Sequence, residues 1–428
     1  MNQVLKTIIK DFHLRSLPPF KQRHLEVPLD LDKIITIIGP RRAGKTWYLF
    51  QLMANLEKSG VKREQILYIN FEDERLDLDT DYDRILGAYF ELYPDQKLDD
   101  IYVFFDEIQE IPNWEKYVRR LYDTVTRKIF LTGSNAKMLS KEIATSLRGR
   151  SLSFEIMPLS FLEFLSFHGI DSRDRHSTQN RAKIQNRFDE YLVWGGYPEL
   201  VGVDTRFKAN ILQEYFNVML YRDLMDRYEI TDASILKYLI KRLIGSFTKE
   251  FSVNKLYNEL KSRGIKIGKD SIYRLMDQIF SIYMVTYVEK YAPAVVKREM
   301  SNKKIYLYDN GIASAIRYAF SEDRGKRLEN LVFAGIRRGT ESVFFLKNGY
   351  ECDFVVFPDM QQPMLIQVAD IIHRDNLKRE INGLEKARKR IKNCRSLLIA
   401  GEIDVPMDLF PEWLEIRTAS EWLLEQNN

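Results

Sequence analysis

The first 150 residues alternate short apolar runs with amphipathic stretches. The runs Lys33–Ile38, Gln65–Asn70, Ile101–Asp106 and Lys128–Thr132 are rich in β-branched and aromatic residues, and such runs are typical of buried parallel strands. The sequence between the runs, for example Trp47–Leu56, predicts helices with one apolar face. This alternation predicts an α/β fold built on a parallel sheet.

The pattern becomes mostly helical between Met157 and Thr248. Within this span, Asp171–Asn186 is polar and predicts a loose connection. Trp194–Pro198 combines two glycines with a proline and predicts a tight, packed turn.

Residues 231–310 have the element order of a winged helix. Three helices and a two-stranded hairpin are predicted, at Ile235–Leu243, Ser252–Ser262, Asp270–Phe280, Met284–Val288 and Lys304–Tyr308. Ser252 is suited to N-cap the second helix. The third helix would be the recognition helix if this module binds DNA. Winged helices also serve as protein-interaction modules, so both kinds of partner stay open.

The loop after the first predicted strand reads Gly39-Pro40-Arg41-Arg42-Ala43-Gly44-Lys45-Thr46 and fits G-x-x-x-x-G-K-[ST] in full. Backbone N–H groups of such a loop and of the following helical turn converge on phosphate oxygens. Lys45 adds a positive charge at the β- and γ-phosphates, and the Thr46 hydroxyl can ligate Mg²⁺. The chain is therefore predicted to bind ATP and Mg²⁺ as a P-loop NTPase.

The run Ile101–Phe105 leads into two acids, Asp106 and Glu107. They stand at the carboxyl end of a strand, where ligands bind in open α/β sheets. We expect Asp106 to hold Mg²⁺ through water and Glu107 to accept the proton of the attacking water. The alternative is that both acids only cap the following helix.

Two other strand ends carry candidate polar residues. Ser134 and Asn135 follow the fourth predicted strand, and we assign Asn135 to the γ-phosphate or the lytic water. A simple turn is the alternative for both residues. Asn70 ends the second strand and could contact Glu107 and gate it, or else close a turn.

Charge is distributed unevenly along the chain. The net charge is +4, but Val253–Lys304 contains eleven Lys/Arg against five Asp/Glu, which is a local +6 and leaves about −2 elsewhere. On the third predicted helix of this stretch, Lys269, Ser271, Arg274 and Gln278 are suited to phosphate and base-edge contacts. The stretch indicates an anionic partner, DNA first, with a solvated basic face as the alternative.

A chain of 428 residues is too long for one ordinary core. We divide it into an ATPase domain, a helical lid, a winged helix and an α/β cap, at residues 1–155, 156–230, 231–310 and 311–428.

Several features argue against an exported or membrane protein. Met1–Lys10 lacks the apolar region of a signal peptide, and no apolar run approaches ~18 residues. Only Cys352 and Cys394 are present, which excludes a disulfide framework and a Cys-based zinc site. We expect a cytoplasmic protein with no membrane partner.

Several motifs together resemble one known family. They are FDEIQ (Phe105–Gln109), TGSN (Thr132–Asn135), Leu147–Arg150, Gly195–Glu199 and Tyr221–Leu224. With the phosphate loop, they are similar to prokaryotic AAA-type ATPases of the archaeal-type, STAND-like branch, over nearly the whole chain. The resemblance implies that Arg150, or else Arg148, reaches a neighbouring subunit's nucleotide as an arginine finger, which requires a homo-oligomer. A surface arginine after a helix is the alternative.

Residues 326–400 predict the order helix, three strands, helix and strand. The elements are Leu328–Arg338, Ser342–Leu346, Asp353–Phe357, Leu365–Val368, Asn376–Ile391 and Ser396–Ala400. This order resembles the restriction-endonuclease-like core, a domain of uncharacterised role that ends this ATPase family.

The resemblance to a nuclease core is incomplete at its site. Glu329 and Asp353 match the acids of an active member, whereas Gln367 and Ala369 stand where such a member has Glu and Lys. With two of four charges missing, we expect weak Mg²⁺ binding and no nuclease activity. A lysine from another position, Lys347 or Lys378, could substitute, but nothing in the sequence favours that.

The main prediction is Mg²⁺-dependent ATP hydrolysis that drives or switches a DNA-associated oligomeric assembly. One alternative is an ATP-binding regulatory or scaffold protein with little turnover, in defence or mobile-element maintenance. Another is an ATP-dependent nuclease, which Gln367 and Ala369 disfavour. The intact pair Asp106 and Glu107 favours hydrolysis over binding alone.

Overall fold

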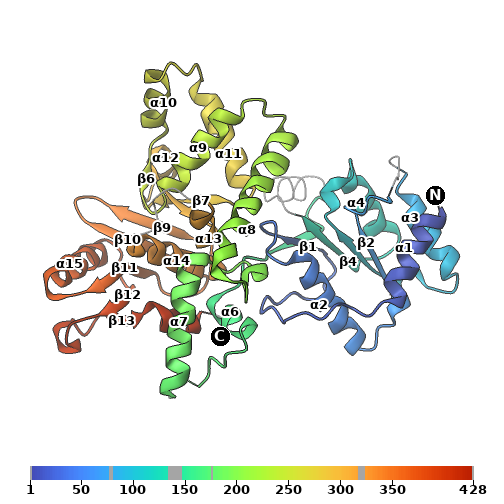
Figure 1. Cartoon of the computed structure of the whole chain (residues 1–428), viewed down its shortest axis with the longest axis horizontal. Coiled ribbons are helices and arrows are strands. Elements are labelled where there is room, and N and C mark those ends of the chain that lie inside the picture. Colours follow the sequence, from blue (N-terminus) through green and yellow to red (C-terminus); the bar gives the residue numbers. More distant parts are fainter. Residues whose placement is uncertain (1, 77–80, 134–146, 175–176, 317–322, 427–428) are drawn as a thin grey trace. The chain divides into compact units, whose positions relative to one another are not determined.

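The computed structural model describes residues 2–76, 81–133, 147–174, 177–316 and 323–426. The chain divides into two units, Met1–Met157 and Pro158–Asn428, which carry the blue-to-cyan and the green-to-red colours of Figure 1.

Unit 1 is built on a parallel sheet with the strand order β2-β3-β4-β1-β5. The strands are β1 (Ile34–Ile38), β2 (Ile66–Asn70), β3 (Tyr102–Asp106), β4 (Ile129–Gly133) and β5 (Ser151–Glu155). The first four confirm the strands predicted from apolar runs. The sequence did not predict β5, because this edge strand is largely solvent-accessible and lacks an apolar run.

Helices cover both faces of this sheet: α1 (Asn2–Leu14), α2 (Lys45–Lys58), α3 (Asp83–Leu92) and α4 (Trp114–Thr124). Figure 1 shows α2 and α4 on opposite faces, as right-handed crossovers require for connections that run in opposite directions along the sheet. On one face Leu49 and Leu52 of α2 share a core with Phe104 and Phe130. On the other face Tyr117 of α4 stacks on Phe105.

Unit 2 begins with helices α6 (Phe161–Phe167), α7 (Thr178–Trp194) and α8 (Thr205–Val218), followed by a π-helix (Met219–Asp226). The loose connection expected up to Asn186 is wrong beyond Ser177. The Ser177 hydroxyl caps α7 by accepting from Asn180 N, and Ile184 is buried. The packed turn is confirmed, because a Cβ on Gly196 would lie 2.3 Å from the Leu159 carbonyl oxygen.

The three helices and the hairpin predicted for residues 231–310 are all present. They are α9 (Ala233–Gly245), α10 (Val253–Ser262), α11 (Lys269–Ser281), β7 (Val285–Lys290) and β8 (Lys303–Leu307). Two short elements, β6 (Glu250–Phe251) and α12 (Val295–Met300), were not predicted. Ser252 caps α10 as expected, by accepting from Lys255 N.

The C-terminal part contains the six predicted elements in order, α14 to β12, and three that were not predicted, α13, β13 and α16. Their bounds are α13 (Asn310–Ala315), α14 (Arg324–Gly339), β9 (Val343–Lys347), β10 (Glu351–Val356), β11 (Met364–Ile372), α15 (Arg374–Arg390), β12 (Arg395–Ile403), β13 (Glu415–Thr418) and α16 (Ala419–Glu425). Because β7 pairs with β9, one sheet of eight strands, in the order β13-β12-β11-β10-β9-β7-β8-β6, runs across the boundary that we placed at residue 310. The helices α14 and α15 pack on opposite faces of this sheet.

Within the described ranges, no helix has the length and apolar character needed to span a bilayer.

Candidate nucleotide-binding site

Two glycines shape the loop between β1 and α2. Gly39 has φ 149°, and a Cβ there would lie 2.2 Å from the Ile156 carbonyl oxygen. Gly44 has φ 96° and is the N-cap of α2. Only glycine tolerates both the backbone angle and the close approach at Gly39. The loop therefore directs the N-terminus of α2, with its unpaired N–H groups, toward the carboxyl edge of the sheet.

A buried arginine, Arg23, fixes this loop through hydrogen bonds. Arg23 is 6% exposed, and its guanidinium donates to the carbonyl oxygens of Ala43 at 2.8 Å and of Met157 at 2.7 Å. Its backbone N–H donates to Gln51 Oε1 of α2 at 2.7 Å. Sequence reasoning missed Arg23, because nothing in its local sequence marks it as buried.

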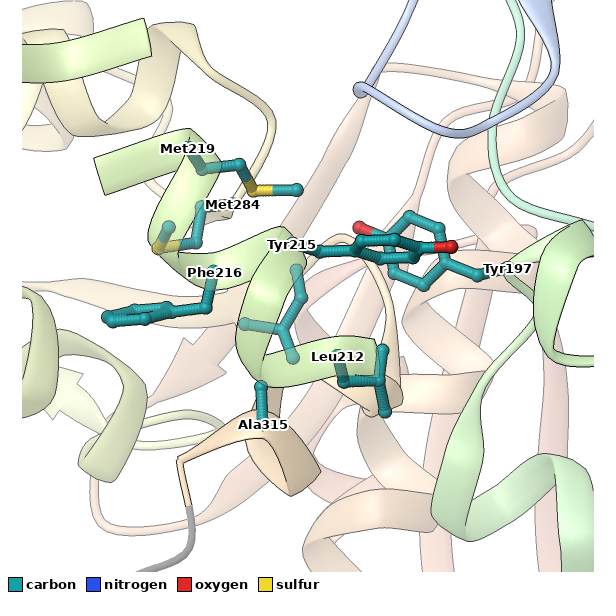
Figure 2. A pocket seen from close by; sticks show the side chains of 8 residues that line it. Tyr197, Leu212, Tyr215, Phe216, Met219, Met284 and Ala315 are labelled. Atoms are coloured by element: carbon teal, nitrogen blue, oxygen red, sulfur yellow. The ribbon is translucent and has the colours of Figure 1, made fainter. Parts of the chain in front are cut away.

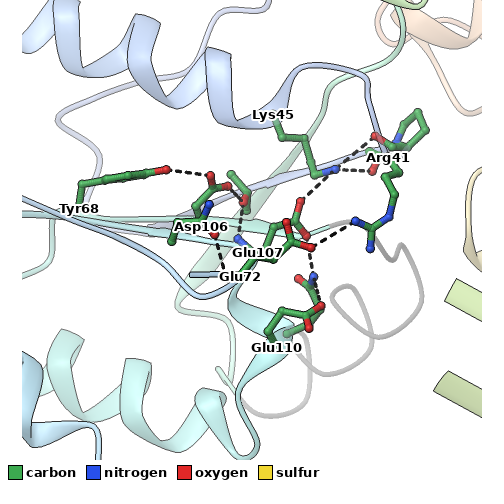
Figure 3. Close-up of polar contacts among 12 residues, drawn as sticks. Arg41, Lys45, Tyr68, Glu72, Asp106, Glu107 and Glu110 are labelled. Carbon is green, nitrogen blue, oxygen red and sulfur yellow. Dashed lines mark hydrogen bonds and ion pairs between the residues drawn. The ribbon is translucent and has the colours of Figure 1, made fainter. Parts of the chain in front are cut away.

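The Lys45 ammonium lies inside the loop (Figure 3). It donates to the carbonyl oxygens of Gly39 at 3.3 Å and of Pro40 at 3.2 Å, and lies 3.6 Å from Glu107 Oε1. Each distance exceeds the ~2.7–2.9 Å of a strong charge-assisted hydrogen bond. Lys45 is thus buried, and its ammonium makes long contacts with the groups around it.

Asp106 is the last residue of β3, and its carboxylate accepts hydrogen bonds from hydroxyl groups of neighbouring strands and of α2. Its Oδ2 accepts from the Tyr68 hydroxyl at 3.1 Å, and its Oδ1 accepts from the Thr132 hydroxyl. The Thr46 hydroxyl also bonds to this carboxylate. Burial and the neighbouring Glu107 charge raise the pKa of Asp106, and these hydrogen bonds oppose the rise. Thr46 and Asp106 therefore meet at one point, a donor pair that fits a Mg²⁺ ion.

Glu107 has a left-handed backbone conformation, φ 50°, which stores strain in a residue other than glycine. Its Oε2 accepts from Gln109 Nε2 at 2.6 Å, and its backbone N–H donates to Thr132 Oγ1 at 2.9 Å. Burial alone would raise the pKa of Glu107, but Lys45, Gln109 and Arg41 outweigh burial and lower it. Glu107 is therefore ionised at neutral pH and able to accept a proton.

Comparison with known proteins agrees with this geometry. Residues 31–165 match the family model of an AAA domain, and residues 185–323 match a domain of unknown function, DUF8612. The chain is 38% identical to uncharacterized protein MJ1544 of Methanocaldococcus jannaschii over 379 residues, which cover 86% of this chain and 82% of that protein. The chain belongs to the AAA-domain family that includes MJ1544.

A second relative is more distant in sequence. An uncharacterized protein of Haemophilus influenzae is 29% identical over 419 residues, covering 98% of this chain and 99% of the relative. Among solved structures, the Aeropyrum pernix ORC1 protein in complex with DNA aligns with 73% of this chain and 90% of its own, at 11% identity and a TM-score of 0.30. A similarity at that score supports no statement about this chain.

The other residues predicted for the nucleotide site of the AAA domain do not all join this group. Arg41 in the loop pairs with Glu72 at 3.3 Å (Figure 3). Asn70 Oδ1 accepts from Glu72 N at 2.9 Å, so the side chain closes a turn and does not gate Glu107. Asn135 lies outside the described residues, as does Ser134.

Arg150 lies at the amino ends of the parallel strands, whereas the phosphate loop lies at their carboxyl ends. Its carbonyl oxygen accepts from Ile34 N at the start of β1, whereas the loop follows the end of β1, roughly 15 Å away at ~3.3 Å per residue. Its guanidinium pairs with Asp123 at 3.0 Å. Arg148 is exposed and has φ 48°. The Arg150 side chain is therefore far from the phosphate loop of the same chain.

Three side chains of the site were not assigned a role from the sequence: Tyr68, Gln109 and Thr132. Thr132 and Tyr68 reach Asp106 from β4 and β2, the strands on either side of β3. A signal was available for Thr132, because it stands at the end of a predicted strand. Strand order is not visible in the sequence, so the contact itself could not be derived.

Unit 2 contains a small apolar cavity, whose lining includes Tyr197, Tyr215, Met219 and Met284 (Figure 2). The rings of Tyr197 and Tyr215 meet edge to face, with centroids 5.4 Å apart. Its empty volume is about 210 Å³, below the ~300–1,000 Å³ of ligand sites. The cavity therefore does not compete with the phosphate loop as a nucleotide site.

Proposed function

We propose that this chain hydrolyses ATP to ADP and phosphate at the carboxyl edge of β1 and β3. One observation carries the proposal. The Thr46–Asp106 contact and the Lys45–Glu107 pair lie side by side, so the groups that would hold Mg²⁺, the phosphates and the lytic water converge. The loop Gly39–Thr46 would hold the phosphates through its backbone N–H groups.

The role of each side chain follows from its position. Thr46 and Asp106 would hold Mg²⁺, which when bound neutralises charge on the phosphate oxygens. In the structure Glu107 is held by both Lys45 and Gln109. As the phosphates draw Lys45 away, one oxygen of Glu107 becomes available to orient water. The water oxygen then bonds to the γ-phosphorus, the bond to the bridging oxygen breaks, and Glu107 takes the proton.

Phosphate release tests the proposal, with Glu110→Gln as the matched control for Glu107→Gln. Both substitutions remove one carboxylate charge from the same turn, and Gln109 Nε2 donates to both carboxylates, at 2.6 Å to Glu107 and at 3.4 Å to Glu110. Glu107 is the one of the two that lies 3.6 Å from the Lys45 ammonium. We expect Glu107→Gln to lower turnover by ~100-fold or more with ATP affinity retained, and Glu110→Gln to retain turnover. Wild-type turnover in both variants would show that Glu107 is not the base, whereas wild-type protein that binds ATP without releasing phosphate would favour the regulatory alternative.

We also propose that the ATPase acts as a homo-oligomer, in which Arg150 inserts into a neighbour's site. The support is the position of Arg150, which lies beside the start of β1, whereas the phosphate loop of the same chain follows the end of β1. The Asp123 pair must open for this contact, which an exposed ion pair permits at a cost of ~1 kcal/mol or less. Arg148 is the second candidate.

We propose the domain division at residues 155, 230 and 310. We also propose that the third of these parts is a winged helix and that it contacts DNA. On α11, Lys269 and Arg274 are exposed, which favours phosphate contacts. Asp270 and Asp277 are exposed on the same helix and weaken the field. Gln278 is less suited than expected, because its Oε1 is buried.

Binding of labelled duplex DNA at several salt concentrations tests the DNA proposal. Replacing Lys269 and Arg274 together by Ala should lower affinity ~10-fold and flatten the salt dependence. The matched control replaces Lys386 and Lys389 of α15, which are also exposed. If both double variants lose affinity equally, net charge and not α11 governs binding.

For residues 311–428, we propose a restriction-endonuclease-like core without nuclease activity. Support comes from the element order of α14, β9, β10, β11, α15 and β12. We expect no cleavage of plasmid or linear DNA with Mg²⁺ or Mn²⁺, with or without ATP. Cleavage by wild type that disappears in Asp353→Asn would contradict this proposal.

A further inference from the structure

A buried lysine of unit 2, Lys304, lies among several carboxylates. Lys304 of β8 is 3% exposed. Its ammonium is 2.7 Å from Glu329 Oε1, 3.1 Å from Asp353 Oδ1 and 3.5 Å from Glu351 Oε1. Glu329 and Asp353 are the two acids that match a nuclease core, so the structure does bring them together, but around a lysine.

Each of these two acids also accepts a further hydrogen bond. Glu329 Oε1 accepts from the Tyr306 hydroxyl at 2.7 Å, and Asp353 Oδ2 accepts from Val368 N at 3.0 Å. Across the part of the chain that the structure describes, no cluster of three or more His, Cys, Asp or Glu is arranged to hold a metal. The Mg²⁺ implied by the nuclease resemblance therefore does not fit the residues present.

The residues that the sequence placed at this site lie elsewhere. Gln367 Nε2 donates to Glu380 of α15 at 3.0 Å. Lys347 pairs with Glu250 at 3.2 Å and lies 3.8 Å from Glu351 Oε2, and Lys378 is exposed on α15. None of these three side chains pairs with Asp353 or Glu329, so among the described residues Lys304 supplies the positive charge between the two acids.

We propose that the Lys304 ammonium occupies the position of a divalent cation between Glu329 and Asp353 and makes the C-terminal core independent of metal. An ammonium is a compact cation with three N–H donors, and three carboxylates lie within 3.5 Å of it. Because Lys304 extends from β8, it also ties the β7–β8 hairpin to α14 and β10. The acids are structural partners of this hairpin.

A displaced catalytic lysine is the competing interpretation. Such a lysine must polarise a water molecule that attacks a phosphodiester, which requires access for both. The side chains of Lys304 and Asp353 are 3% and 8% exposed, and that of Glu329 is 15% exposed. Glu351 is 44% exposed, but the Lys304 ammonium and the two acids that match a nuclease core are largely covered, which favours the role of fixed counter-ion.

Mn²⁺ binding without nucleotide, followed by electron paramagnetic resonance, tests the proposal. Wild type and Asp353→Asn should bind the same number of ions, because the site is already filled. Lys304→Met removes the charge at similar volume and should gain one Mn²⁺ site. The double variant Lys304→Met/Asp353→Asn should lack that gained site.

Two results would overturn the proposal: an Mn²⁺ site in wild type that Asp353→Asn removes, or a folded Lys304→Met without a gained site at millimolar Mn²⁺. Mn²⁺-dependent nicking of plasmid that Lys304→Met abolishes would establish the catalytic lysine instead. If Lys304→Met does not fold with or without Mn²⁺, the comparison of wild type with Asp353→Asn still decides.

Discussion

Lys45 in unit 1 and Lys304 in unit 2 are both buried lysines beside acids, and the two are held differently. The Lys45 ammonium makes three contacts of 3.2 to 3.6 Å, two of them to backbone carbonyls. The Lys304 ammonium has two carboxylates within 3.1 Å. A cation with long contacts can transfer to incoming phosphates, whereas one held by two buried carboxylates serves as part of the core.

The difference has its origin in the elements that present each lysine. Lys45 stands at the first turn of α2, after a glycine loop that leaves backbone N–H groups unpaired. Lys304 stands within a strand paired on both sides, with β6 and β7. The same side-chain types therefore make a ligand site at a helix N-terminus and an internal counter-ion within a sheet.

The largest expected effect tests whether the Lys45 site is complete in one subunit. Arg150→Ala should lower ATP turnover by ~10³-fold or more with little change in ATP affinity, because a finger stabilises charge only in the transition state. Turnover per subunit should also rise with protein concentration. The readout is phosphate release over a dilution series, with Arg127→Ala, another exposed arginine paired to an acid, as control.

Constant turnover per subunit down to demonstrated monomer would contradict the role in trans. Loss of turnover in Arg148→Ala with full activity in Arg150→Ala would move the role to the second candidate.

Replacing each lysine by Met should lower the free energy of unfolding by different amounts in the two clusters. Lys304→Met should lower the free energy of unfolding of unit 2 by about 3–5 kcal/mol, because it leaves buried carboxylates unpaired. Lys45→Met should cost about 1 kcal/mol or less, since Glu107 keeps its bond from Gln109. Denaturant unfolding followed by hydrogen exchange resolves the two units. Similar losses would remove the distinction between a transferable and a structural lysine.

A smaller effect concerns pH. Burial, with the charge of Asp353, raises the pKa of Glu329 to about 7 against the opposing charge of Lys304. Between the unfolded value near 4.5 and this value, the folded state binds a proton that the unfolded state lacks. The free energy of unfolding therefore falls as pH rises through this window, by about 3 kcal/mol at most.

Glu329→Gln should flatten that fall between pH 5 and pH 8, measured as the free energy of unfolding of unit 2. Burial also raises the pKa of Asp309, to about 6, and this carboxyl adds a fall of the same sign. The difference between wild type and Glu329→Gln isolates the Glu329 part. A parallel pH dependence in both proteins would contradict the buried, coupled environment of Glu329.

The phosphate loop could be predicted because its chemistry is contained in eight consecutive residues, Gly39–Thr46. Asp106 and Glu107 could be predicted because they end an apolar strand. Tyr68 and Thr132 could not, since their contact with Asp106 depends on which strands are neighbours. Predicting these two required the strand order and not the sequence pattern.

The limit of prediction from the sequence is clearest at Lys304. In the sequence it belongs to a basic stretch and suggests a solvated or DNA-binding face, yet its side chain is buried by α14 and β10, elements that follow in the chain. The same limit applies to Arg23, whose partners Ala43 and Met157 lie 20 and 134 residues away. Local pattern identified the elements, and long-range packing decided which charges became internal.

ATP affinity with Mg²⁺, measured by calorimetry on wild type, Lys45→Met and Lys304→Met, tests the central claim most directly. Wild type should bind ATP. Lys45→Met should lose ~100-fold or more in affinity, because it removes the transferable cation at the phosphates. Lys304→Met should retain wild-type affinity. ATP binding by Lys45→Met at the wild-type level, or a loss of equal size in Lys304→Met, would contradict the assignment of the nucleotide site.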